Sequence, residues 1–409
     1  MSDPGARLVS ALGFVAMIAI AWGFSQDRRR FPWRTVGWGV ALQLSLGAVL
    51  LRTRVGEGFF RVTNGVVDRF IRYVEAGVRF VFGPLVDTGF SIVVNVLPII
   101  VFMGSVFSIL YHLRILQRVV DALARLLSRT MGTSGAESLA AVANIFLGMT
   151  EAALVVRPYL ERMTRSELFA LMTTGMASVA GSVLVAYVGM LGGEYAGHLA
   201  TASLLSAPAG LLLAKVMVPE ADTPETATAS HAPVEISSVN LIDAAAQGAI
   251  AGLRLAAYVG ALLIAFVALV AMLNHALGVA GGLVGLPDLS MQRVLGFVLA
   301  PLAWLMGVPW QDAARVGSLL GVKTVLNEFL AYQELGALIH SGALEERSAV
   351  IASYALCGFA NFGSLAILLG GIGGLAPARR PEVARLGLLS ILAGSLASFM
   401  TACVAGIFV

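Results

Sequence analysis

The stretch Asn144-Ile-Phe-Leu-Gly-Met-Thr-Glu-Ala-Ala-Leu-Val-Val-Arg-Pro158 carries a carboxylate, Glu151, in the middle of apolar sequence. A later stretch, Gly321-Val-Lys-Thr-Val-Leu-Asn-Glu-Phe-Leu-Ala-Tyr332, carries Glu328 in the same kind of short polar break. A carboxylate at membrane depth costs about 2.5–3.5 kcal/mol or more, so it persists where it faces a wet cavity and has a function. Two of them in similar surroundings indicate a duplicated half and one shared polar site.

The composition identifies an integral membrane protein. Of the 409 residues 58% are hydrophobic and 12% are charged, and the mean hydropathy is +0.86. A soluble protein carries about 25% charged residues to cover its surface. The 45 glycines agree with a helical membrane protein, because small residues let membrane helices pack closely. The net charge of +3 gives no support for nucleic-acid binding. The high hydrophobic fraction makes the lipid bilayer the expected surroundings of the chain.

The sequence offers no chemistry typical of an enzyme. None of the five histidines has a partner at metal-ligand spacing, and no Gly-Lys-Ser/Thr nucleotide loop is present. The two cysteines lie in apolar runs without CxxC spacing. A nucleophile–base pair is also missing, so we expect neither an enzyme nor a bound organic cofactor.

Hydropathy predicts eight membrane-spanning helices, since each crossing takes about 20 residues. They cover approximately residues 8–24, 36–51, 90–112, 167–191, 199–218, 250–273, 349–370 and 383–408. The first is expected to be a span rather than a signal peptide, because no small-residue cleavage site follows it. Amphipathic patterns predict interfacial helices at 57–82 and 115–130, and a second surface or partial helix at 291–310.

Two further segments, 134–160 and 312–335, are apolar but broken by the polar residues around the two glutamates. Each half is too short to cross, which predicts two re-entrant helical hairpins. Gly181-Ser182 and Gly363-Ser364 follow the hairpins at matching places. Broken helices at corresponding positions in two halves point to a substrate site at the bilayer midplane.

The repeat divides the chain into four parts. We expect N-terminal spans and an interfacial helix that form a scaffold in 1–85, a first repeat in 86–218, a cytoplasmic loop and lead-in in 219–248, and a second repeat in 249–409. Arginines at 28–34 and 379–385 place the loops that contain them in the cytoplasm and leave both termini outside. The arginines of 52–79 fall outside in this arrangement and count against it.

The sequence also allows a purely structural role for the two glutamates instead of a substrate site. Glu151 and Glu328 would then form ion pairs with Arg157 and Lys323. Serine and threonine in membrane helices usually bond their own i−4 carbonyl or a neighbouring helix. The clustering of polar residues beside both breaks favours a functional site.

Three segments resemble the motifs of a known family. They are the first stretch above extended to Tyr159, Leu326-Asn-Glu-Phe-Leu-Ala-Tyr332, and Cys357-Gly-Phe-Ala-Asn-Phe-Gly-Ser-Leu-Ala-Ile-Leu-Leu-Gly-Gly-Ile-Gly-Gly-Leu-Ala-Pro377. The chain resembles bacterial concentrative nucleoside transporters over nearly its whole length. The resemblance implies an all-α integral membrane fold with eight transmembrane helices, two re-entrant hairpins in an inverted repeat, and interfacial helices. It also implies a homotrimer in the bacterial inner membrane, with a transport domain that moves like an elevator against a trimerisation scaffold.

The resemblance assigns a nucleoside site to named residues. The base would meet Met149, Thr150, Glu151, Val183 and Phe359. The ribose hydroxyls would bond Glu328, Asn361 and Ser364. A carboxylate accepts hydrogen bonds from two vicinal hydroxyls, and an amide both donates and accepts.

The resemblance also implies a sodium site formed by Asn144, Leu147, Ser178 and Val179, mostly through backbone carbonyls. Hard oxygen ligands at an unwound helix suit a small hard cation, so sodium is the favoured coupling ion. Some relatives use protons, which Glu151 or Glu328 would carry.

One residue departs from the family pattern. The family commonly has glutamine where this chain has Met149, and methionine cannot make that hydrogen bond to the base. Its thioether packs flexibly against flat rings, which suggests a changed base preference, towards purines. The alternative is that Met149 is neutral and a water molecule fills the gap. The residues also leave open a nucleobase or other small polar cargo, and a non-transporting gate or scaffold.

Overall fold

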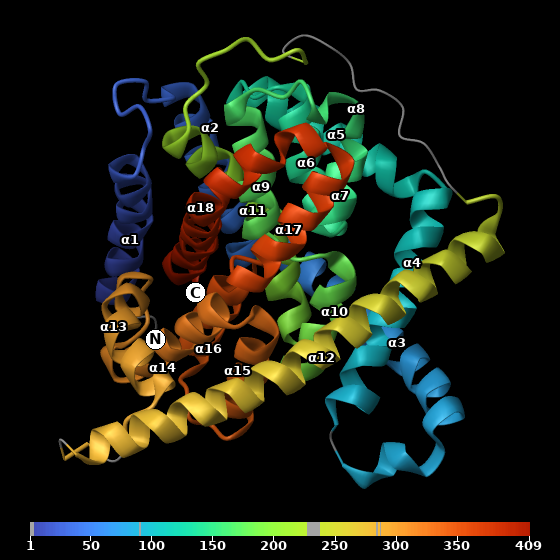
Figure 1. Ribbon diagram of the computed structural model, residues 1–409, viewed down its shortest axis with the longest axis vertical. Helices are drawn as coiled ribbons and strands as arrows, with labels where there is room; N and C mark the ends of the chain where they lie inside the picture. Colours follow the sequence, from blue (N-terminus) through green and yellow to red (C-terminus); the bar gives the residue numbers. More distant parts are fainter. Residues whose placement is uncertain (1–3, 90, 227–237, 284, 287) are drawn as a thin grey trace.

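The computed structural model describes residues 4–89, 91–226, 238–283, 285–286 and 288–409, and this part of the chain is helical without strands (Figure 1). The N-terminal half contains α1 (Pro4–Gly23), α2 (Trp33–Arg52), α3 (Arg54–Phe82), the short η1 (Gly83–Thr88) and η2 (Ile92–Val96), α4 (Leu97–His112), α5 (Ile115–Met131), α6 (Gly135–Phe146), α7 (Met149–Val155), α8 (Arg157–Leu160), α9 (Arg165–Ala177), α10 (Gly181–Leu191) and α11 (Tyr195–Met217). The C-terminal half contains α12 (Leu241–Gly282), α13 (Met291–Leu305), α14 (Trp310–Val325), α15 (Glu328–His340), α16 (Glu346–Leu356), α17 (Phe362–Leu375), the short η3 (Pro377–Arg379) and α18 (Arg380–Phe408).

Within these ranges, seven helical segments are long and apolar enough to cross a membrane: α1, α2, η2 with α4, α9 with α10, α11, α12, and η3 with α18. The remaining predicted span, 349–370, corresponds to α16 and α17. α13 and α14 are bent by 116° at a short break, and together they are apolar enough to form either a broken span or a re-entrant segment.

Two predicted spans are not continuous helices. The span at 167–191 is interrupted at Ser178–Ala180 between α9 and α10, and the span at 349–370 is interrupted at 357–361 between α16 and α17. Neither break contains a charged residue, so the hydropathy pattern runs through both of them. The sixth span is also longer than predicted, because α12 extends over 42 residues instead of 250–273.

The order of elements repeats. The series α4, α5, α6 with α7, α9 with α10, and α11 is followed by α12, α13, α14 with α15, α16 with α17, and α18. The pairs α6–α7 and α14–α15 are the two predicted hairpins, and their helices meet at Leu147–Gly148 and at Leu326–Asn327. The polar breaks around the two glutamates therefore coincide with the hairpin turns.

The helices form a bundle, and the long helix α12 runs diagonally across the molecule (Figure 1). α9, α11 and α18 pack together in the bundle, α1 packs against α18, and α2 packs against α11. α12 runs across the molecule beside α4, and the two helices approach closely at glycines. A Cβ at Gly104 would lie 2.5 Å from the Gly248 carbonyl oxygen, and a Cβ at Gly252 would lie 2.7 Å from that of Ile100.

Both predicted amphipathic helices form, as α3 and α5. In α3 the buried valines Val67, Val74 and Val78 recur at helical spacing, and charged residues occupy the other face. Their position at a membrane surface stays a prediction.

A buried ionic network holds the base of the first hairpin. The Lys215 ammonium on α11 lies 2.6 Å from the Glu137 carboxylate on α6 and 3.1 Å from that of Glu220. It also donates a hydrogen bond to the Ser166 hydroxyl at the start of α9. The side chains of Lys215 and Glu137 are only 6% and 1% exposed, so this pair is largely shielded from water.

We expect Lys215→Met to destabilise the protein strongly, because it leaves two carboxylates without their cation. Removing one partner of a buried pair costs about 3–5 kcal/mol. Thermal unfolding of the detergent-purified protein measures the effect. The matched control is Arg79→Met, which breaks an ion pair with Asp87 whose side chains are more than half exposed. Equal melting temperatures for the two variants would contradict a structural role of the network.

Candidate functional site

The site is built where the two interrupted spans touch. The backbone N–H of Phe359, in the second break, donates a hydrogen bond to the carbonyl oxygen of Ser178, in the first break, over 3.2 Å. Unwound backbone frees amides and carbonyls that must find partners at membrane depth. The two breaks supply one of these partners to each other.

Four helices begin around a single cavity of about 740 Å³. They are α7 and α15 of the hairpins and α10 and α17 of the interrupted spans, and residues from the first turn of each line the cavity. A helix N-terminus carries unpaired N–H groups and a partial positive charge. The cavity therefore favours a carboxylate and ligand groups that accept hydrogen bonds.

Glu328 is the fixed acceptor in this cavity. It is 7% exposed and begins α15. The Tyr187 hydroxyl donates to one of its carboxylate oxygens over 2.9 Å, and the Asn361 side-chain amide donates to the other over 2.7 Å. The Asn361 side-chain oxygen accepts from the Ser364 backbone N–H over 2.7 Å and so caps α17. This cap orients the amide, since its oxygen faces the helix and its NH₂ faces Glu328.

Tyr187 was not predicted, although it stands directly behind Glu328. Its ring stacks on Tyr332 with centroids 4.2 Å apart and meets Phe329 edge-on. The Tyr332 hydroxyl is in turn fixed by the Ser353 carbonyl oxygen. The available signal was spacing, since Tyr187 lies four residues after Val183 and so shares its face of the helix.

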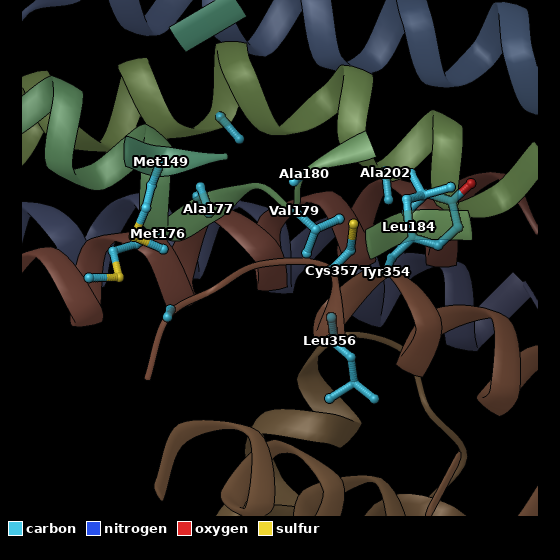
Figure 2. Packing of buried hydrophobic residues seen from close by; sticks show 14 of the residues in the cluster. Met149, Met176, Ala177, Val179, Ala180, Leu184, Ala202, Tyr354, Leu356 and Cys357 are labelled. Atoms are coloured by element: carbon cyan, nitrogen blue, oxygen red, sulfur yellow. The ribbon is translucent and has the colours of Figure 1, made fainter. Parts of the chain in front are cut away.

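The first hairpin places Met149, Thr150 and Glu151 in the opposite wall. Glu151 is exposed, and its carboxylate accepts a hydrogen bond from the Thr150 hydroxyl over 2.9 Å. Met149 is 5% exposed and extends towards Met176 near the end of α9 (Figure 2). Its side chain therefore borders both the cavity and the core.

All the residues predicted to contact a base or a ribose line this cavity, as does Leu147. The other predicted ion ligands lie outside its lining, close to the C-terminus of α9. The Asn144 side-chain amide donates to the Thr174 hydroxyl over 3.3 Å, and the Ser178 hydroxyl donates to the Thr174 carbonyl oxygen over 2.9 Å. Val179 follows and is fully buried.

These residues fit a small cation. The Asn144 side-chain oxygen is buried and finds no hydrogen-bond partner among the residues that the structure describes. α6 and α9 both end here, and the last carbonyls of a helix carry a partial negative charge. Over the described ranges, no group of three or more His, Cys, Asp or Glu side chains is arranged to hold a metal ion. The donor set is thus amide, hydroxyl and backbone oxygen, which suits a hard monovalent cation.

The two glutamates do not form the ion pairs with Arg157 and Lys323 that the structural alternative required. Among the described residues, no ion pair includes Glu151 or Glu328. Lys323 instead donates to the carbonyl oxygen of Ala355 over 2.9 Å. Arg157 lines the cavity and is exposed.

The cavity also has a wall that sequence reasoning missed. α4 and α12 contribute Phe107, Tyr111, Gln247 and Tyr258 to it. Phe107, Tyr111 and Tyr258 lie in apolar segments without a polar break, and Gln247 falls in the predicted loop and lead-in, so no local pattern distinguished them. Through these residues α4 and α12 form part of the same cavity as the hairpins and the interrupted spans.

Known proteins resemble the chain along its whole length. Family models described as Na⁺ dependent nucleoside transporter N-terminus and C-terminus match residues 12–85 and 198–406, and a model described as nucleoside recognition matches 93–194. An uncharacterized transporter of Bacillus subtilis, YutK, is 45% identical over 97% of this chain and 98% of its own. The nucleoside permease NupC of Helicobacter pylori is 42% identical over 98% of both chains.

A eukaryotic protein and several solved structures are also similar to this chain. Solute carrier family 28 member 3 of Mus musculus is 42% identical over 98% of this chain and 59% of its own length. The structure of CNTnw in an inward-facing substrate-bound state superposes with a TM-score of 0.92, at 44% identity and 98% coverage of both chains. A doubly substituted CNTnw in an outward-facing state gives a TM-score of 0.94 at 43% identity, covering 99% of both.

Sodium should stabilise this protein through the α6–α9 junction. A ligand that binds only the folded state stabilises it by RT ln(1 + [L]/Kd), about 2.7 kcal/mol at one hundred times Kd. We expect a higher melting temperature in sodium chloride than in choline chloride of equal ionic strength. Asn144→Leu combined with Ser178→Ala should abolish the difference, whereas Ser390→Ala, at a fully buried serine on α18 whose hydroxyl donates to a carbonyl of its own helix, should keep it. Equal melting temperatures in both salts for the native chain would argue against the site.

Proposed function

The chain belongs to the Na⁺ dependent nucleoside transporter family, and we propose that it imports nucleosides across the bacterial inner membrane by sodium symport. The family predicted from the three motif segments is confirmed, as are the all-helical membrane fold and the absence of an enzymatic function. The protein is a multi-pass membrane transporter.

The observation that carries the proposal is the buried Glu328, held by Tyr187 and Asn361 at the meeting point of four helix N-termini. Each carboxylate oxygen already accepts one fixed donor and retains lone pairs towards the cavity. Two vicinal ribose hydroxyls match such an acceptor, and Asn361 and Ser364 stand beside it. A site built on hydroxyl hydrogen bonds rejects sugars that lack them, because its own polar groups are left unpaired.

The base would lie towards the first hairpin. Phe359 and Val183 offer apolar surface to a flat ring, and Thr150 and Glu151 offer polar groups to its edge. Met149 adds a polarizable contact without a hydrogen bond. The ribose residues thus all come from the second half of the repeat, whereas the base residues come from the first half except for Phe359.

Sodium coupling is supported by the position of the candidate ion ligands. Asn144, Leu147, Ser178 and Val179 surround the ends of α6 and α9, directly behind the cavity wall. The Ser178 carbonyl oxygen accepts the backbone hydrogen bond of Phe359, so a single hydrogen bond links the ion region to the base region. One charge falling through 100 mV releases about 2.3 kcal/mol, enough for roughly fifty-fold accumulation.

Alternating access would occur by an elevator movement of the bundle against α4 and α12. The hairpins and interrupted spans lie in one body, and α4 and α12 close only one side of the cavity. The apolar stretch of α12 is only 17% buried, so it offers a surface for the trimerisation scaffold of a homotrimer. The assignment of residues 1–85 to the scaffold stays a prediction, and α1 and α2 contact α18 and α11 of the bundle.

Uptake into proteoliposomes tests the proposal. We expect an inward sodium gradient to drive accumulation of radiolabelled uridine or adenosine, and a proton gradient alone to drive little. Glu328→Gln should lower kcat/KM by about 100-fold or more, since two hydrogen bonds to a charged group are together worth at least about 3 kcal/mol. The 2′- and 3′-deoxynucleosides should be poor substrates for the native chain.

Glu334→Gln is the matched control, because Glu334 lies on the same helix outside the cavity lining. Uptake that follows the proton gradient would replace sodium with the proton as the coupling ion. Equal transport of free nucleobases, or full activity of Glu328→Gln, would favour the alternative of a nucleobase or another small polar cargo.

Met149 should tune base preference. We expect the native chain to favour purines in competition among uridine, cytidine, adenosine, inosine and guanosine. Met149→Gln restores a hydrogen-bonding group and should raise the uridine-to-adenosine ratio of kcat/KM about fivefold, the equivalent of about 1 kcal/mol for one neutral hydrogen bond. Met163→Gln, at a similarly buried methionine outside the cavity lining, serves as control. A strong pyrimidine preference in the native chain would refute this role.

A further inference from the structure

The two halves of the site place different residues at equivalent positions. In the first hairpin, Asn144 lies three residues before Leu147, the residue that caps the end of α6. In the second hairpin, Lys323 lies three residues before Leu326, which caps the end of α14. The interrupted spans correspond in the same way, since α9 is capped by Ser178 and α16 by Cys357.

Lys323 brings a full positive charge to the end of two helices. Its side chain is 0% exposed, and its ammonium donates to the carbonyl oxygen of Ala355 in the last turn of α16 over 2.9 Å. The same ammonium lies 5.8 Å from the ring centroid of Phe399 on α18. A helix C-terminus carries a partial negative charge that a cation stabilises. Lys323 also interacts electrostatically with Glu328, without forming a close ion pair.

The equivalent place in the first half is lined by oxygen instead. Asn144 offers a side-chain oxygen that has no partner among the described residues, and Ser178 offers a hydroxyl. In the second half these two residue types are replaced by an ammonium and by the thiol of Cys357, and a thiol is a poor ligand for a hard cation. The first half is therefore suited to a mobile cation, whereas the second half carries its cation on the chain.

We propose that Lys323 is a tethered cation, which occupies in the second half the position that a mobile sodium ion occupies in the first, so that a single sodium ion is bound per nucleoside. The inference rests on the sodium site proposed above. Lys323 acts as a positioning residue: it satisfies the Ala355 carbonyl in the last turn of α16 and holds positive charge near Glu328 throughout the cycle. The second half then needs no ion from solution when the ribose binds.

The sodium dependence of uptake tests this inference. For the native chain we expect a Hill coefficient for sodium of about 1, and Lys323→Arg, which keeps the charge, should leave it there. The double variant Lys323→Asn with Cys357→Ser gives the second half the residue types of the first, and its coefficient should rise towards about 2. Parallel counting of ²²Na⁺ and labelled nucleoside entry should show the same change in stoichiometry.

Each outcome separates the inference from the sodium symport on which it rests. Native uptake with a coefficient of about 2, or with two sodium ions entering per nucleoside, would overturn the tethered cation and leave sodium coupling intact. Native uptake without any sodium dependence would overturn the coupling itself. A double variant that transports with an unchanged coefficient would show that the two positions are not equivalent. If the double variant does not fold, the native stoichiometry alone decides.

Discussion

The constraint on which this structure depends is that every backbone polar group at membrane depth must find a partner. Four helices are broken or folded back at the same level, and each break frees amides on one side and carbonyls on the other. The hydrogen bond between Phe359 and Ser178 satisfies one donor and one acceptor directly. The remaining backbone amides and carbonyls are separated in space, because the helix N-termini gather around the cavity and the helix C-termini lie behind it.

That division explains why the two ligands have different chemistry. Helix starts attract acceptors, so they hold the Glu328 carboxylate and suit a polar sugar. Helix ends attract cations, so they hold the Lys323 ammonium in one half and present Asn144 and Ser178 in the other. Tyr187 and Asn361 then fix the carboxylate in one orientation, and each is itself fixed by a second contact. The site is rigid because few of its polar groups depend on the ligand alone.

How far the sequence predicts this arrangement depends on what marks each break. Glu151 and Glu328 interrupt apolar segments with charge, so both hairpins could be located from hydropathy alone. The breaks at Ser178 and Cys357 contain only small or uncharged residues, and hydropathy runs through them without a change. Lys323 and Glu328 are five positions apart and looked like partners, but the ammonium turns to a carbonyl of another helix. Tyr187 and the wall from α4 and α12 depend on long-range packing, which no local pattern records.

The length of α12 has a geometric consequence. At 1.5 Å per residue, its 42 residues extend about 63 Å, roughly twice the thickness of the hydrocarbon core. A straight helix of that length fits within the hydrocarbon core only if it is strongly tilted, and α12 runs diagonally across the molecule in Figure 1. A tilted α12 offers the bundle an inclined contact surface. In the proposed elevator movement, a body that keeps contact with a tilted α12 would move sideways through the lipid as well as along the membrane normal.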